Sequence, residues 1–161
     1  MIVVSDTSCI TNLLLINHLC LLQKIYSEIR IPSTVYKEIL TLGKKGKDLS
    51  YLKSKAWIFV ENNFTKNISL SPPKYIDAGK AEAIDLALYL KADRLLIDER
   101  KGIAFANQLG IATIGLLGVL IIGKQNNYIT LIKELVDKLI ENKFWISASL
   151  YHQILKIANE L

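Results

Sequence analysis

The chain has 161 residues, of which 51% are hydrophobic and 22% charged, and its formal net charge is +5. This length suits one domain, and the apolar fraction is high enough to bury a core, which excludes an intrinsically disordered chain. The two cysteines, Cys9 and Cys20, are too few for a disulfide scaffold. No apolar stretch reaches the roughly 20 residues of a membrane helix, and the first residues lack the features of a signal peptide. We therefore expect a cytoplasmic protein with no membrane segment.

The hydrophobic pattern alternates between strands and helices along the chain. In chain order it predicts a strand at 2–4, a helix at 13–26, a strand at 29–31, a helix at 33–42, a strand at 57–60, a helix at 78–90, a strand at 95–97, a helix at 103–109, a strand at 111–114 and three helices at about 116–124, 128–142 and 147–160. This alternation indicates an α/β fold with a mostly parallel sheet. We interpret residues 1–161 as one domain, which the C-terminal helices from about residue 128 complete.

Acidic residues directly follow two of the predicted strands. Asp6 comes after the strand at 2–4, and Asp98 comes after the strand at 95–97. The carboxyl ends of parallel strands share one edge of the sheet, where ligands bind, so we expect both carboxylates at that edge. Glu38 lies on the helix after the second strand and Glu82 on the helix before Asp98, and both can face the same edge.

The helix predicted at 78–90 is apolar around most of its circumference. Its exception is a narrow stripe of Glu82, Asp85, Tyr89 and Asp93. An acid on a buried helix is costly unless it is paired or binds a cation. We therefore interpret Glu82 as a candidate site residue, and Asp85 and Asp93 as solvent-facing residues.

Several carboxylates gathered together are the ligands that hard divalent ions such as Mg²⁺ and Mn²⁺ take. An ion held in this way activates water and stabilises charge on a phosphate. The basic residues indicate a polyanionic partner, because residues 37–66 hold seven lysines and three acids and so carry +4 of the net charge. Lys44, Lys45 and Lys47 are candidates to contact an RNA backbone. A solvated, lysine-rich surface explains them equally well.

Four stretches of the chain, in this order, resemble the PIN-domain proteins. They are Val-Ser-Asp-Thr-Ser at 4–8, Ile-Pro at 31–32 with Val35 and Glu38, Ala-Gly-Lys-Ala-Glu-Ala-Ile at 78–84, and Leu-Leu-Ile-Asp-Glu-Arg-Lys-Gly at 95–102. The chain is most similar to the DUF3368 group, which is related to VapC toxins, and the resemblance runs from residue 1 nearly to the C-terminus. It implies a three-layer α/β/α fold and a Mg²⁺- or Mn²⁺-dependent ribonuclease that hydrolyses RNA phosphodiester bonds.

The resemblance also implies a set of site residues and partners. The implied catalytic acids are Asp6, Glu38, Glu82 and Asp98, with the metal on Asp6, Glu82 and Asp98. The implied supporting residues are Thr7, Ser8 and Glu99, and Glu99 competes with Asp98 for the place of fourth acid. Many relatives are toxins that pair with a small antitoxin and form homodimers, so we expect RNA, a cognate antitoxin and a second copy as partners.

One departure from the family pattern bears on activity. Relatives in this group read Gly-Glu-Ala-Glu-Ala where this chain has Gly79-Lys80-Ala81-Glu82-Ala83. Lys80 lies about 200° from Glu82 around the helix, so we expect Glu82, and not position 80, to supply the ligand. If position 80 is the true ligand, the chain is instead a catalytically weak nucleic-acid-binding or protein-interaction module that retains the fold.

Overall fold

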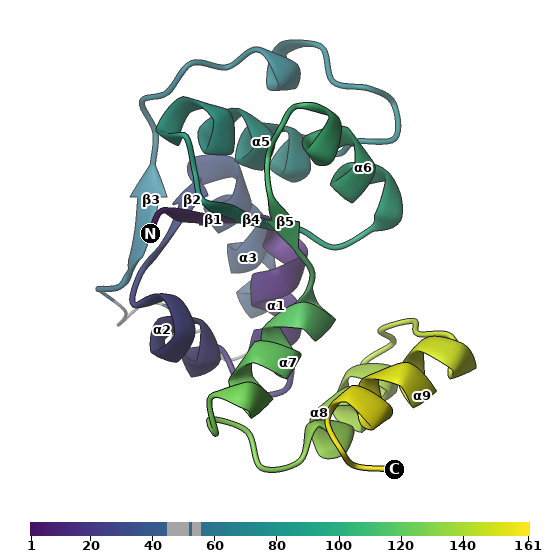
Figure 1. Cartoon of the computed structure of the whole chain (residues 1–161). Coiled ribbons are helices and arrows are strands. Elements are labelled where there is room, and N and C mark those ends of the chain that lie inside the picture. The colour runs from purple at the N-terminus through teal and green to yellow at the C-terminus, as the bar shows by residue number, and fades with distance from the viewer. Residues whose placement is uncertain (45–51, 53–55) are drawn as a thin grey trace.

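The computed structural model of the chain describes residues 1–44, 52 and 56–161 and contains a five-stranded parallel sheet (Figure 1). The strand order is β3-β2-β1-β4-β5. The strands are β1 (Val3–Ser5), β2 (Ile29–Pro32), β3 (Ile58–Glu61), β4 (Arg94–Leu96) and β5 (Thr113–Ile114). The predicted α/β class with a parallel sheet is therefore confirmed.

Helices connect the strands and continue beyond the last of them. They are α1 (Thr7–Leu15), α2 (Cys20–Tyr26), α3 (Ser33–Lys44), the short 3-10 helix η1 (Ile68–Leu70), α5 (Ala78–Leu90), α6 (Arg100–Gln108), α7 (Leu116–Gln125), α8 (Ile132–Glu141) and α9 (Ala148–Ile157).

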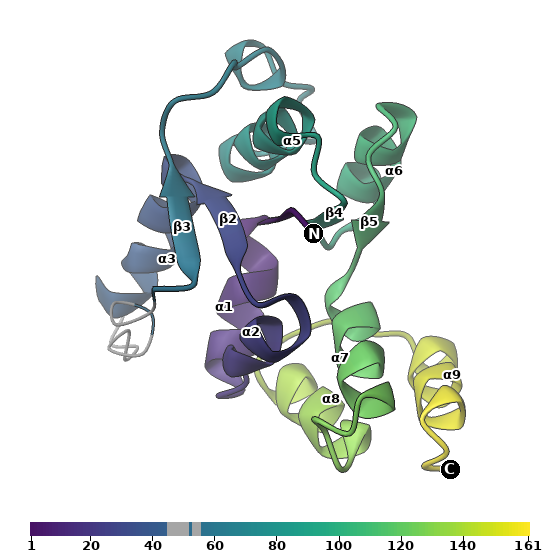
Figure 2. The ribbon, with the colours of Figure 1, turned by 60° about the vertical axis from the view of Figure 1, so that its left-hand side comes forward.

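The sheet separates two apolar cores, because successive side chains of a strand point to opposite faces. Val3 and Leu96 belong to the larger core, which includes buried residues of α1, α2, α3 and α7. Val4, Leu95 and Ile97 belong to the smaller core, together with buried residues of α5 and α6. Figures 1 and 2 show the corresponding layers, with α5 and α6 on one side of the sheet and α1 and α7 on the other.

The helix predicted at 13–26 is wrong in its extent, because the structure has two helices there. α1 begins at Thr7, since the side chain of Asp6 caps it by accepting from the backbone N–H of Cys9. The chain then turns between α1 and α2, where Asn17 takes a φ of 58° and the His18 N–H bonds back to the carbonyl of Leu13. Asparagine is one of the few non-glycine residues that tolerate this left-handed conformation.

The C-terminal helices α8 and α9 pack beside α7, away from the sheet (Figure 2). The carboxylate of Glu160 ties them together. It accepts from the backbone N–H groups of Ile132 (2.8 Å) and Lys133 (2.9 Å) in the first turn of α8 and pairs with Lys124 of α7 at 3.0 Å. An anion at a helix N-terminus is favourable, so this contact fixes the end of the chain on α7 and α8.

Candidate functional site

Two carboxylates meet at the carboxyl edge of the sheet. β1 and β4 are parallel neighbours with Ser5 opposite Leu96, so the residues that follow them emerge side by side. Cys9 joins the two acids, because its backbone N–H donates to Asp6 Oδ1 at 3.1 Å and its Sγ lies 3.5 Å from Asp98 Oδ2. The structure therefore brings together Asp6 and Asp98, as the strand pattern predicts.

Asp6 is fully buried and held by local hydrogen bonds. The hydroxyl of Ser8 lies 3.0 Å from Asp6 Oδ2 and 3.2 Å from Oδ1, so Ser8 orients this carboxylate. Burial raises the pKa of Asp6 to about 6; Lys80 and the Cys9 amide oppose the rise, and the charge of Asp98 adds to it. The charge of Lys80 therefore favours the ionised form of this buried carboxylate.

The side chain of Asp98 contacts the first residue of α7. The backbone N–H of Leu116 donates to Asp98 Oδ1 at 2.9 Å, so the carboxylate binds the positive end of that helix. A Cβ atom on Gly115 would lie only 2.8 Å from the same oxygen, so the absent side chain makes room for it. Burial raises the pKa of Asp98, although the Leu116 amide, Cys9 and Lys80 act in the opposite direction. Glu99, the alternative fourth acid, is exposed and caps α6 by accepting from the N–H of Lys101.

Glu38 reaches the same region from α3. The hydroxyl of Thr7 donates to Glu38 Oε2, so Thr7 orients Glu38 and not Asp6. The Glu38 carboxylate lies against the first turn of α5, where a Cβ atom on Gly79 would come within 2.5 Å of Glu38 Oε1. Gly79 therefore permits the close approach of α5 to this carboxylate.

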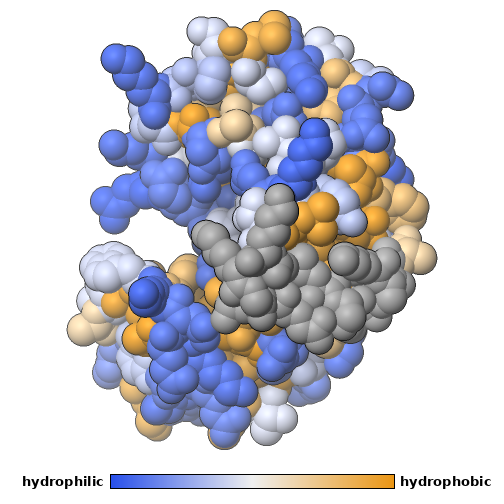
Figure 3. Space-filling model, turned by 180° about the vertical axis from the view of Figure 1, so that it is seen from behind, coloured by the Kyte–Doolittle hydropathy of each residue, from blue (hydrophilic) through white to orange (hydrophobic). Residues whose placement is uncertain are grey.

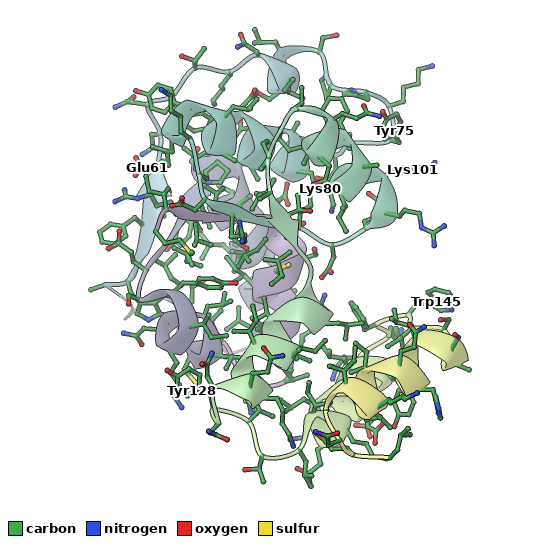
Figure 4. The ribbon with its side chains drawn as sticks, in the orientation of Figure 1. Glu61, Tyr75, Lys80, Lys101, Tyr128 and Trp145 are labelled. Carbon is green, nitrogen blue, oxygen red and sulfur yellow. The ribbon has the colours of Figure 1, made fainter. Side chains whose placement is uncertain are left out.

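Lys80 is the residue of α5 that faces this acidic centre (Figure 4). Its Nζ lies 3.7 Å from Asp6 Oδ2 and 3.3 Å from Asp77 Oδ2, and its side chain is only 14% exposed. Burial alone would lower the pKa of Lys80, but the charges of Asp6, Asp77 and Glu99 outweigh it and raise the pKa. Lys80 is therefore a largely buried ammonium group that lies between the carboxylates of Asp6 and Asp77.

Glu82 lies elsewhere on α5, in contact with the segment that crosses this helix. Its Oε1 accepts from Lys66 Nζ at 3.0 Å, and its buried Oε2 has no partner among the described residues. Asp85, one turn further on, accepts from the backbone N–H groups of Asn67, Ile68 and Ser69 at 2.8–3.1 Å. These acids pin the segment at 62–77 to α5. Asp85 is only 2% exposed, so its predicted position facing solvent is wrong.

We predicted that Glu82 faces the site and that position 80 does not. The structure has the opposite arrangement, because Lys80 pairs with Asp6 and Glu82 pairs with Lys66. The angle of about 200° between the two residues is sound, but Lys80 takes the side toward Asp6. The direction in which α5 runs relative to the sheet could have predicted this arrangement. A helix that precedes a parallel strand begins at the carboxyl edge of the sheet, so the first turn of α5, with Gly79 and Lys80, had to lie at the site.

The residues as arranged do not fit the Mg²⁺ or Mn²⁺ ion that the resemblance implies. A hard divalent ion takes several oxygen ligands, whereas here an ammonium group lies against Asp6. In the described ranges, 1–44, 52 and 56–161, no three His, Cys, Asp or Glu side chains are placed to hold one metal ion. The positive charge that these acids require comes from Lys80.

The predicted RNA-binding lysines lie mostly where the structure gives no description. Lys45 and Lys47 are outside the described residues, and Lys44 is the last residue of α3. None of the helices in the described part of the chain is long and apolar enough to cross a membrane.

Comparison with protein-family models gives a match over nearly the whole chain. The family model described as DUF3368, a PIN domain, matches residues 2–160. A search of curated proteins and a search of solved structures each returned no match.

Proposed function

We propose that this chain, which belongs to the DUF3368 family of PIN domains, is a nucleic-acid-binding protein in which Lys80 replaces the divalent metal ion. PIN domains are generally nucleases and act on nucleic acids. The observation that carries the proposal is the position of the Lys80 ammonium, 3.7 Å from Asp6 Oδ2 and itself largely buried. It satisfies the carboxylates that would otherwise attract a metal ion.

Electrostatics supports this reading. A divalent ion between Asp6 and Asp98 would meet the like charge of Lys80 at close range in a region shielded from water. There the repulsion amounts to several kcal/mol. Lys80 leaves this centre only by breaking its pairs with Asp6 and Asp77, and breaking a buried ion pair is itself costly. Hydrolysis that depends on a metal ion at this centre is therefore disfavoured.

RNA is the nucleic acid that we propose as the partner. The net charge of +5 favours a polyanion. Lys44, Lys45 and Lys47 remain our proposed contacts to the RNA backbone. Replacing all three with alanine should weaken binding and reduce its salt dependence. An unchanged salt dependence would mean that these lysines do not contact RNA and are ordinary solvent-exposed residues.

A metal-dependent ribonuclease is the second candidate. Its support is the convergence of Asp6, Glu38 and Asp98 on one edge of the sheet. In this candidate Asp6 and Asp98 would hold the Mg²⁺ or Mn²⁺ ion, which would activate water for attack on the phosphate, and the Lys80 side chain would have to turn away from Asp6. A role as the toxin of a toxin–antitoxin pair, with an antitoxin partner, a homodimeric state and a cytoplasmic location, belongs to the same candidate.

One experiment separates the two candidates. Purified protein is incubated with a panel of labelled single-stranded RNAs in Mn²⁺, Mg²⁺ or EDTA, and both cleavage and fluorescence anisotropy are followed. We expect binding in EDTA and no cleavage that depends on the metal ion. The Asp6→Asn variant, purified in the same way, controls for contaminating ribonuclease. Cleavage that needs Mn²⁺ or Mg²⁺ and is lost in Asp6→Asn would establish the second candidate, and absence of any binding would end the first.

A further inference from the structure

Trp145 is an aromatic side chain that the fold leaves in solvent. It lies in the connection between α8 and α9 and is 82% exposed. Its neighbours Phe144 and Ile146 pack against the core, so the connection is anchored on both sides of the tryptophan. An indole ring presents a large apolar surface to water. Because this ring contributes little to the core, it is available for contact with a ligand.

A second exposed aromatic residue lies on the same side of the molecule. Figure 4 shows Tyr75 and Lys101 above an opening and Trp145 below it, with Lys80 further inside. Tyr75 is 50% exposed, and Lys101 Nζ lies 5.8 Å from the centre of its ring. Figure 3, which views the molecule from behind, shows that a hollow separates the upper and lower parts at this edge.

Exposed cations accompany the aromatic residues in the sequence. Lys74 precedes Tyr75, Arg100 and Lys101 open α6, and Lys143 lies two residues before Trp145. The same short segments hold three exposed acids, of which Asp77 is paired with Lys80 and Glu99 caps α6; the third is Glu141. The charge balance is thus only slightly positive, and it fits a ligand that stacks on the rings and places few phosphates there.

We infer that this hollow binds a single-stranded nucleic acid, with an unpaired base stacked on Trp145 and the adjacent phosphate near Lys101. The inference rests on the proposed function and names where the strand lies. A base in a duplex has both faces covered, so a ring available for stacking selects an unpaired base. Stacking platforms flanked by cations are the usual means of binding single strands without sequence preference.

The test compares two exposed aromatic residues, each beside a lysine. Tyr128 is the matched control, because it is 44% exposed with Lys24 Nζ 5.9 Å from its ring centre, and Figure 4 shows it at the opposite side of the molecule. Binding of a fluorescein-labelled oligo(U) is measured by anisotropy in EDTA. Trp145→Ala should weaken binding about tenfold, Trp145→Phe should weaken it less, and Tyr128→Ala should leave it unchanged.

Tryptophan fluorescence gives a second readout. Trp57, the other tryptophan, is only 6% exposed, so quenching by unlabelled oligo(U) should come from Trp145 and disappear in Trp145→Phe. If wild type binds oligo(U) and Trp145→Ala binds it equally well, this inference is wrong and the proposed function stands. Failure of wild type to bind any RNA would end both. A Trp145→Ala variant that binds normally but changes from dimer to monomer in sedimentation would assign the ring to a contact between copies and overturn the inference.

Discussion

Replacing Lys80 with glutamate removes the cation of the acidic centre and adds one more acid. The pair of Lys80 and Asp6 is buried, with side-chain exposures of 14% and 0%. Removing one partner of a buried ion pair costs about 3–5 kcal/mol. The introduced carboxylate also meets Asp6 and Asp98, although protonation limits that repulsion. In EDTA at pH 7 we therefore expect the free energy of unfolding to fall by about 3–5 kcal/mol, which lowers Tm by roughly 6–20 °C for a chain of this size.

The same variant should acquire an affinity for metal ions. Without the ammonium group, Asp6, Asp98 and the introduced glutamate form a set of oxygen ligands of the kind that Mn²⁺ takes. Thermal melts in Mn²⁺ should then recover about 2.7 kcal/mol of stability at 100 times Kd, while wild type shows no response. Lys80→Met is the matched control, because it removes the charge without adding a ligand and should not respond to Mn²⁺. A Mn²⁺ response in wild type equal to that of Lys80→Glu would refute the reasoning.

Three other substitutions test the remaining contacts. Burial raises the pKa of Asp6 from 3.8 to about 6, so its stabilising contribution is complete below about pH 4 and is lost as the pH rises through 6. In urea melts the stability of wild type should therefore fall between pH 4 and pH 7 by an amount on the order of 1–3 kcal/mol, and Asp6→Asn should lack this fall; equal pH dependence of the two proteins would contradict the assignment. Asp85→Ala leaves three backbone N–H groups without their acceptor. It should cost about 3 kcal/mol or more and make residues 62–77 the first site of limited proteolysis; equal protease resistance would show that Asp85 does not hold the segment. Glu82→Gln weakens the contact with Lys66, so it should lower stability by about 1 kcal/mol and leave RNA binding unchanged in the anisotropy assay. A strong loss of binding would show that Glu82 belongs to the functional site.

The parallel sheet and the meeting of two acids could be predicted from the sequence, but the order of the strands was not. Short apolar runs locate the strands, and the rule that ligands lie at the carboxyl edge of a parallel sheet then joins Asp6 to Asp98. The break between α1 and α2 could not be predicted from periodicity, because the apolar spacing continues across it and only the left-handed conformation of Asn17 interrupts the helix.

The role of Lys80 was missed for a different reason. Helical periodicity gives the angle between Lys80 and Glu82 but not which of them faces the sheet edge. That choice depends on where α5 begins, on the close approach of Gly79 to Glu38, and on the segment at 62–77 that covers Glu82 through Lys66. Contacts of this kind join residues far apart in the chain, so they cannot be predicted from local sequence patterns.

A crystal of the wild-type protein soaked in Mn²⁺ tests the central claim most directly. We predict no anomalous peak between Asp6 and Asp98, with Lys80 Nζ still paired with Asp6 as in this structure. An anomalous peak about 2.1 Å from oxygens of both carboxylates, with the Lys80 side chain turned out toward solvent, would contradict the claim that Lys80 replaces the metal ion.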